Sequence, residues 1–272
     1  MEQQQNWRGN FQTFRQVIPQ MEELPFQARE AINVLRGNIQ LSGYELRTIA
    51  VTSAMPNEGK SSTAFRLAKS MAGLGTRTIY LDCDIRNSEV MARYQIQQSV
   101  CGLSEFLCGR VSLNDIIYHT DDPCMDMIFT GAVAPNPSEL LSGPLFVQLL
   151  DELKKNYEYV IVDTPPVCPV IDGALIAKKC DGTILVVECG KTEKTLAVKA
   201  TRQLEYAGVR ILGAVLNKVG ASNKGYGYGY GYGYGYGYGY GYGKGNTKKA
   251  AKKQNKAAQN GNVKSVRDKK RA

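Results

Sequence analysis

The stretch "TIAVTSAMPNEGKSSTAFRLAKSMAG", Thr48 to Gly73, decides the fold that this sequence predicts. It opens with "TIAVTS", a short run that is apolar or β-branched at both odd and even positions, as in strands covered on both faces. The loop "AMPNEGKS", Ala54 to Ser61, follows the run. A helix comes next, and four of its apolar residues share one face: Ala64, Leu67, Ala68 and Met71. The stretch therefore predicts a strand, a loop and a helix in direct succession.

The loop fits the phosphate-loop pattern, with alanine in place of the first glycine. In such a loop, backbone N–H groups and the N-terminus of the helix form a cradle for anions. We expect Lys60 to reach the β- and γ-phosphates of a nucleotide and the Ser61 hydroxyl to ligate Mg²⁺. The alternative is a chance Gly-Lys-Ser turn. The residues expected to bind the nucleotide here are Ala54, Met55, Pro56, Asn57, Glu58, Gly59, Lys60, Ser61 and Ser62.

Beyond this stretch, short apolar runs alternate with amphipathic segments such as "EKTLAVKATRQLEYAG". The runs are "TIYLDCD", "MDMIFTG", "YVIVDTPP", "TILVVE" and "ILGAVLN". This alternation predicts an α/β fold with a doubly wound, mostly parallel sheet. We divide the chain into a flexible N-terminal arm (1–25), a nucleotide-binding domain that starts with a helix (26–220), and a Tyr/Gly and basic tail (221–272). The tail has too few apolar groups to offset the entropy of ordering, so we expect it to be disordered.

Two of the predicted strands end in acidic residues, Asp82 and Asp84 on one and Asp163 on the other. The carboxyl ends of parallel strands share one edge of a sheet, beside the phosphate loop. Oxygen ligands suit a magnesium-bound nucleotide, although acids also end strands simply as solvated loop residues. Asp82 and Asp84 could divide the work, one accepting a hydroxyl proton and the other holding the metal. Such a pair calls for an acceptor hydroxyl.

The tail offers nine such hydroxyls in "GYGYGYGYGYGYGYGYGYG". They are Tyr226, Tyr228, Tyr230, Tyr232, Tyr234, Tyr236, Tyr238, Tyr240 and Tyr242. Glycine-rich strands are costly to order, so a flexible ribbon that presents each phenol is favoured over a strand. Fifteen residues from Val219 to Tyr234 span a root-mean-square distance of roughly 20 Å and at most about 50 Å. The active site of a neighbouring subunit lies within that range.

Charge is distributed unevenly along the 272 residues. The net charge is +9, yet residues 224–272 carry 12 Lys and Arg against one acid, so the rest of the chain is close to neutral. A basic, tyrosine-rich tail also suits single-stranded nucleic acid or anionic lipid as a partner. Complete phosphorylation would reverse the sign of the net charge of the tail, since each phosphotyrosine adds a charge of roughly −1.5 to −2. We expect this reversal to loosen an assembly.

Several protein classes are not indicated. Seven scattered cysteines without a CxxC pair, together with a single histidine, do not form a zinc motif. The N-terminus lacks a signal-peptide pattern, and no apolar run approaches the ~20 residues that span a bilayer. We expect a cytoplasmic protein that reaches the membrane only through a partner or its tail.

With these residues in place, the chain resembles the bacterial tyrosine kinases, in particular the autonomous cytoplasmic members that serve capsule and exopolysaccharide synthesis in Gram-positive bacteria. The resemblance runs from about Glu30 to Tyr242 and rests on six motifs: "SAMPNEGKSS", "IYLDCDIR", "VIVDTPP", "GLSEFLCG", "PNPSELLSG" and "LGAVLNKV". It implies ATP and Mg²⁺ as cofactors and autophosphorylation of the tyrosine cluster between subunits of a ring. By motif, it assigns catalysis to Lys60, Asp82 and Asp84, with Asp82 as the base for the phenol. It places Ser61, Asp84 and Asp163 around the metal and Asn217 against the adenine.

The resemblance also implies partners: a membrane adaptor of the polysaccharide co-polymerase type, further copies of the chain, and a cognate tyrosine phosphatase, with no nucleic acid. The protein would then sit at the inner face of the membrane through its adaptor. One departure concerns the ring-forming helix, where the family has Glu, Arg and Arg at three-residue spacing. This chain has Glu30, Asn33 and Arg36, so one fork-shaped donor is missing.

The alternative is a dimerising ATPase of the MinD/ParA type, which shares the P-loop fold and positions partners without phosphorylating them. Those proteins usually carry a lysine early in the phosphate loop. Here "SAMPNE" has none before Lys60.

Overall fold

The computed structural model describes residues 15–220. The predicted tail, with its nine tyrosines, and residues 1–14 of the predicted arm lie outside the described residues. Within them, seven strands form one sheet in the order β3-β4-β2-β5-β1-β6-β7. Every neighbouring pair is parallel except β3 and β4. The doubly wound, mostly parallel fold predicted from the sequence is thereby confirmed.

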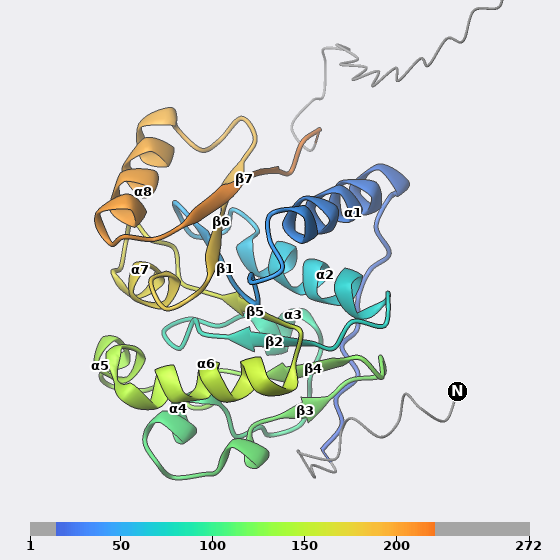
Figure 1. Ribbon diagram of the computed structural model, residues 1–272, viewed down its shortest axis with the longest axis vertical. Coiled ribbons are helices and arrows are strands. Elements are labelled where there is room, and N and C mark those ends of the chain that lie inside the picture. Colours follow the sequence, from blue (N-terminus) through green and yellow to red (C-terminus); the bar gives the residue numbers. More distant parts are fainter. Residues whose placement is uncertain (1–14, 221–272) are drawn as a thin grey trace, which may run out of the picture. The chain divides into compact units, whose positions relative to one another are not determined.

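The strands and helices alternate along the chain, as Figure 1 shows. The strands are β1 (Thr48–Ser53), β2 (Thr78–Asp82), β3 (Tyr118–His119), β4 (Met125–Ile128), β5 (Tyr159–Asp163), β6 (Gly182–Glu188) and β7 (Ile211–Asn217). The helices are α1 (Phe26–Leu41), α2 (Lys60–Ala72), α3 (Val90–Arg93), α4 (Leu103–Leu107), α5 (Pro137–Ser142), α6 (Pro144–Asn156), α7 (Asp172–Ala177) and α8 (Lys194–Tyr206), with a 3₁₀ turn at Leu113–Asp115.

The sheet has a core on each face because successive strand residues point to opposite sides. On one face, Tyr80 and Ile161 pack with Phe65 and Met71 of α2, and α1 lies over α2. On the other face, Ile79 and the residues around it pack against α4 and α6, while a third cluster lies under α7 and α8. Each central strand is therefore buried on both sides, which explains its uninterrupted apolar sequence.

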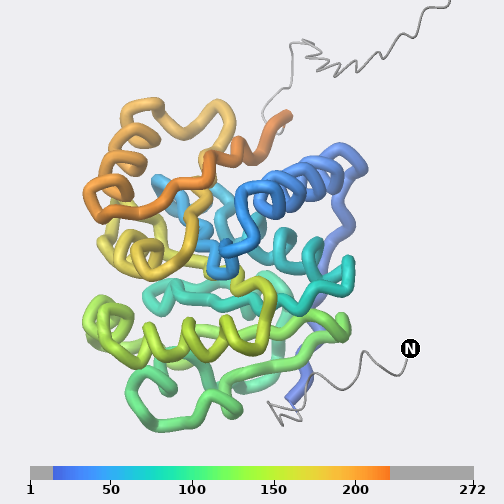
Figure 2. The backbone as a smooth tube through the Cα atoms, in the orientation of Figure 1, coloured from blue at the N-terminus to red at the C-terminus, as the bar shows by residue number. Residues whose placement is uncertain are grey.

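Residues 15–25 depart from the expected flexible arm. This segment runs along the side of the domain from β3 to α1, as the tube in Figure 2 shows. The backbone N–H of Val17 donates to the carbonyl of His119 at 2.8 Å, and Gln20 donates to Tyr94 at 3.0 Å. Val17 is 2% exposed and belongs to the core. These eleven residues are thus part of the domain, because one apolar side chain and an unpaired strand edge are available to hold them.

Candidate active site

The phosphate loop joins β1 to α2 as the sequence predicts. Gly59 precedes α2 with φ +94°, and a Cβ at this position would lie 2.0 Å from Nδ2 of Asn217. Only glycine fits, for both reasons. The Nδ2 group of Asn217 donates to the carbonyl of Glu58 at 2.9 Å, and Nζ of Lys218 donates to the carbonyl of Asn57 at 2.6 Å. The end of β7 therefore supports the loop from behind.

The side chain of Glu58 holds the loop from inside. Glu58 is 3% exposed. One of its oxygens accepts from the backbone N–H of Met55 at 2.9 Å, and the other accepts from the hydroxyl of Thr192 in a short hydrogen bond. A buried carboxylate with two donors is satisfied. Glu58 thus shapes the loop.

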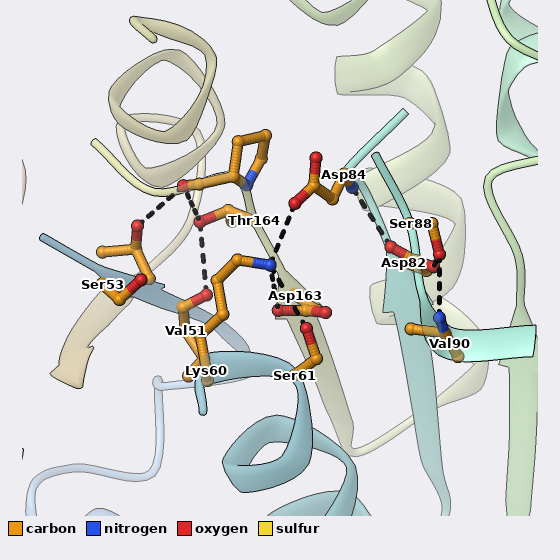
Figure 3. A network of polar contacts seen from close by, with 12 residues as sticks. Val51, Ser53, Lys60, Ser61, Asp82, Asp84, Ser88, Val90, Asp163 and Thr164 are labelled. Atoms are coloured by element: carbon orange, nitrogen blue, oxygen red, sulfur yellow. Dashed lines mark hydrogen bonds and ion pairs between the residues drawn. The ribbon is translucent and has the colours of Figure 1, made fainter. Parts of the chain in front are cut away.

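Lys60 is the first residue of α2, and three oxygens surround its ammonium group (Figure 3). Nζ lies 3.0 Å from Oδ2 of Asp84 and 3.7 Å from Oδ1 of Asp163. It also donates to the Ser61 hydroxyl at 3.2 Å. Burial alone would lower the pKa of Lys60, but Asp163 and Asp84 outweigh burial and raise it. The lysine is therefore charged and already paired with acceptors.

Asp82 and Asp163 end neighbouring strands and stand opposite each other in the sheet register. Both are 0% exposed. Burial raises the pKa of Asp82 to about 7, with the charge of Asp163 adding to the effect and hydrogen bonds opposing it. Burial also raises the pKa of Asp163, opposed by Lys60. A carboxylate that takes up a proton near neutral pH suits a general base.

The donor set fits a magnesium ion. Oδ2 of Asp163 accepts from the buried Tyr80 hydroxyl at 2.9 Å, whereas its Oδ1 faces Lys60 at 3.7 Å and has no hydrogen-bond partner among residues 15–220. Ser61 and Asp84 lie close to Asp163, because the Lys60 ammonium group donates to both of them. Within residues 15–220 there is no group of three His, Cys, Asp or Glu side chains arranged for a metal. Mg²⁺ in nucleotide sites keeps waters and takes one or two carboxylates plus phosphate oxygens, so this small set, with one carboxylate oxygen outside any hydrogen bond, is suitable.

A cavity of about 260 Å³ joins these groups. Its wall includes the predicted residues Pro56, Asn57, Gly59, Lys60, Ser61, Ser62, Asp82, Asp84 and Asp163. Four other predicted nucleotide-binding residues are not part of that wall: Ala54, Met55, Glu58 and Asn217. Ala54 is fully buried, the Glu58 side chain holds the loop from inside, and Asn217 supports the loop from behind.

Arg86 and Ser88 are further polar residues on the cavity wall. Arg86 pairs with the buried Asp172 and donates to the Ser138 hydroxyl at 3.0 Å, which ties the loop after β2 to α5 and α7. Ser88 donates to Oδ2 of Asp82 in a short hydrogen bond. The sequence signal for Ser88 was only its closeness to "DCD", since an isolated serine in a loop has no pattern of its own.

The fold and this site define a P-loop nucleotide-binding protein. The family model described as an AAA domain matches residues 46–205. Tyrosine-protein kinase CpsD of Streptococcus pneumoniae is 40% identical over 201 residues, which are 74% of this chain and 88% of that protein. The chain belongs to the bacterial tyrosine kinases, and it is a protein-tyrosine kinase.

Solved structures agree with this assignment. The kinase domain of Escherichia coli tyrosine kinase ETK superposes with a TM-score of 0.69 at 31% identity, covering 83% of this chain and 92% of that domain. The cell division ATPase MinD of Pyrococcus furiosus gives a TM-score of 0.56 at 22% identity, over 65% of this chain and 74% of that one. That second likeness shows the fold alone, so the partitioning-type ATPase has less support than the kinase.

None of the helices in residues 15–220 combines the length and the hydropathy that crossing a membrane requires.

Proposed function

We propose that the chain transfers the γ-phosphoryl group of MgATP to tyrosine hydroxyls, and that its own nine tail tyrosines are acceptors. One observation carries the proposal. At a single edge of the sheet, the phosphate-loop lysine lies between Asp84 and Asp163, and a third buried carboxylate, Asp82, stands next in register. A nucleotide site with an additional carboxylate of raised pKa suits transfer to a hydroxyl that must lose its proton.

Each residue then has a role in the transfer. The phosphate loop binds the β- and γ-phosphates, and Lys60 exchanges its carboxylate partners for phosphate oxygens. The phenol oxygen bonds to the γ-phosphorus as the bond from that phosphorus to the bridging oxygen of ADP breaks. Asp82 accepts the phenol proton. When bound, Mg²⁺ supplies positive charge to the phosphate oxygens, and Ser61, Asp84 and Asp163 would hold it.

Transfer between chains is part of the proposal. We place the kinase in a ring of its own copies, activated by a membrane adaptor, opposed by a tyrosine phosphatase and regulating capsular or extracellular polysaccharide synthesis and export. The support is the six-motif resemblance together with the named relatives. Asn217 remains a proposed adenine contact; its Nδ2 group donates to the loop, while its Oδ1 takes part in no hydrogen bond among residues 15–220.

The test is incubation with MgATP, with and without a candidate adaptor segment, followed by intact mass. Serial additions of phosphate are expected, and they should vanish in Lys60→Met and in a variant whose nine tail tyrosines are phenylalanine. ATP consumption without any change in mass would favour the partitioning-type ATPase instead. Mixing Lys60→Met protein with an active chain that lacks the ribbon tests transfer between chains: the Lys60→Met tail should gain phosphate.

A further inference from the structure

Ser88 lies in the loop after β2, where both donor and acceptor functions of its hydroxyl are used (Figure 3). It donates to Oδ2 of Asp82 and accepts from the backbone N–H of Val90 at 3.2 Å. Val90 begins α3 and is 1% exposed within the core. The hydroxyl is therefore held by a fixed point of the backbone and is not a freely rotating group on the surface.

The two oxygens of Asp82 are held by different donors. Oδ1 accepts from the backbone N–H of Asp84 at 3.1 Å, and Oδ2 accepts from Ser88. Turning the carboxylate would break both hydrogen bonds of a side chain that is 0% exposed, where an unpaired polar group is expensive. Of the two donors, only Ser88 is a side chain, so it is the one that a substitution can remove.

We infer that Ser88 is a positioning residue for phosphoryl transfer: its hydroxyl fixes the carboxylate of Asp82 in the orientation that receives the phenol proton. This inference rests on the proposed role of Asp82 as the base. Each carboxylate oxygen carries two lone pairs, so an oxygen that already accepts from Ser88 still has one for the phenol. Ser88 keeps its own proton throughout. The phenol oxygen–phosphorus bond forms, the bond to the bridging oxygen of ADP breaks, and the phenol proton goes to Asp82.

The same contact has an opposite interpretation. The Ser88 hydroxyl donates to Asp82 just as an incoming phenol would, so it could instead occupy the place of the acceptor and slow transfer. The two interpretations predict opposite signs when the hydroxyl is removed. Positioning is favoured by the anchor to Val90, because a group that has to leave before every turnover would not be tied to a buried helix start.

The experiment uses the full chain and measures the initial rate of phosphate gain at saturating and limiting MgATP. Ser88→Ala is expected to lower kcat about tenfold, a part of the contribution of a general base, while the KM for ATP and the affinity for MgADP stay unchanged. Ser88→Thr keeps the hydroxyl and should restore most of kcat. Ser88→Cys keeps the size but offers only a weak donor, and should resemble Ser88→Ala. The exposed Ser99 supplies the control, and Ser99→Ala should leave every constant unchanged.

A double-variant comparison separates this role from a structural one. In an Asp82→Asn background, Ser88→Ala should cause no further loss, because its effect passes through Asp82. If Asp82→Asn lowers kcat but Ser88→Ala matches the parent, the inference is wrong and the proposed function stands. A kcat above the parent for Ser88→Ala would show that the hydroxyl blocks the acceptor. If Asp82→Asn transfers phosphate at the parent rate, the assignment of the base fails, and the inference fails with it.

Discussion

Lys60 shows how the site handles charge at the scale of single residues. Its ammonium group is 3.0 Å from Asp84 and 3.7 Å from Asp163 in a largely buried position. Buried charges are tolerated when they are paired and hydrogen-bonded, and removing one partner leaves the others uncompensated. The lysine therefore serves both the stability of the nucleotide-free site and the binding of phosphate.

Replacing Lys60 with methionine should affect both properties. We expect phosphate transfer to fall at least about a hundredfold, since a principal donor to the transferring group is lost. We also expect a lower melting temperature without nucleotide, because Asp84 and Asp163 lose their cation. Intact mass and a thermal melt measure the two effects. Lys69→Met, at a half-buried position near the end of the same helix, is the control, and equal melting temperatures for the two variants would contradict the stability argument.

The sequence predicts some of these residues much better than others. Lys60, Asp82, Asp84 and Asp163 lie together because each follows or ends a strand, and parallel strands bring such ends to one edge. Nothing in the sequence indicates that Ser88 contacts Asp82. That contact depends on how the loop after β2 turns back, which local pattern does not determine.

At the scale of elements, the end of β7 supports the phosphate loop through Gly59. Gly59→Ala should lower the affinity for MgADP at least about tenfold, because the residue has a left-handed backbone and its Cβ would meet Asn217. Gly75→Ala is the matched control: φ there is +81°, but nothing lies within 4 Å of the added carbon. It should cost roughly 1–2 kcal/mol of stability and leave the affinity unchanged. Calorimetric titration with MgADP compares the two, and equal affinities would contradict this account.

The start of α4 provides a test by pH. Burial alone would raise the pKa of Glu105, but hydrogen bonds outweigh it and lower the pKa below its usual value. The donors are the backbone N–H groups of Ala132 and Gly102, each at 2.9 Å. A depressed pKa in the folded state means that Glu105 stabilises the fold above its ordinary pKa and loses this contribution as the pH falls through the lowered value. Between pH 7 and pH 3, Glu105→Gln should lose less stability than the parent in urea unfolding, whereas parallel losses would refute the argument.

At the scale of the whole molecule, α1 shows what Asn33 does in the place where the family motif has arginine. Asn33 donates to Glu30 at 2.9 Å, and Arg36 donates to the carbonyl and hydroxyl oxygens of Ser70 on α2. The three residues that correspond to the expected ring motif thus contact their own chain. An arginine at position 33 would carry five N–H donors, more than Glu30 alone engages, and so would have donors left for a neighbouring chain.

Asn33→Arg is therefore expected to shift the chain toward larger assemblies at a given concentration, seen as a higher mass in light scattering. Asn38→Arg adds the same charge at an exposed position of α1 and should leave the mass unchanged. Equal masses for Asn33→Arg and the parent would show that the departure has no bearing on assembly.

The sequence also predicts the domain as a whole better than its edges. Strand and helix alternation indicated the parallel sheet, because buried strands and amphipathic helices have distinct periodicities. The sequence predicts a flexible arm at residues 15–25, and the structure differs. Their attachment depends on contact between Val17 and an unpaired strand edge at His119, about a hundred positions later in the chain. Pairing across such separations is a tertiary property.

The ion pairs of Lys60 with Asp84 and Asp163 have a consequence for ligand selectivity. A bare anion that captured the lysine would leave Asp84 and Asp163 without their shared cation, although these side chains are only 9% and 0% exposed. A nucleotide that binds together with a divalent cation supplies a positive charge to Asp84 and Asp163 in place of Lys60. We therefore expect free phosphate, sulfate and metal-free ATP to bind more weakly than a magnesium nucleotide, because they bring no cation to replace Lys60 beside the two carboxylates. The nucleotide-free kinase would thus select its ligand by charge before any tyrosine enters the site.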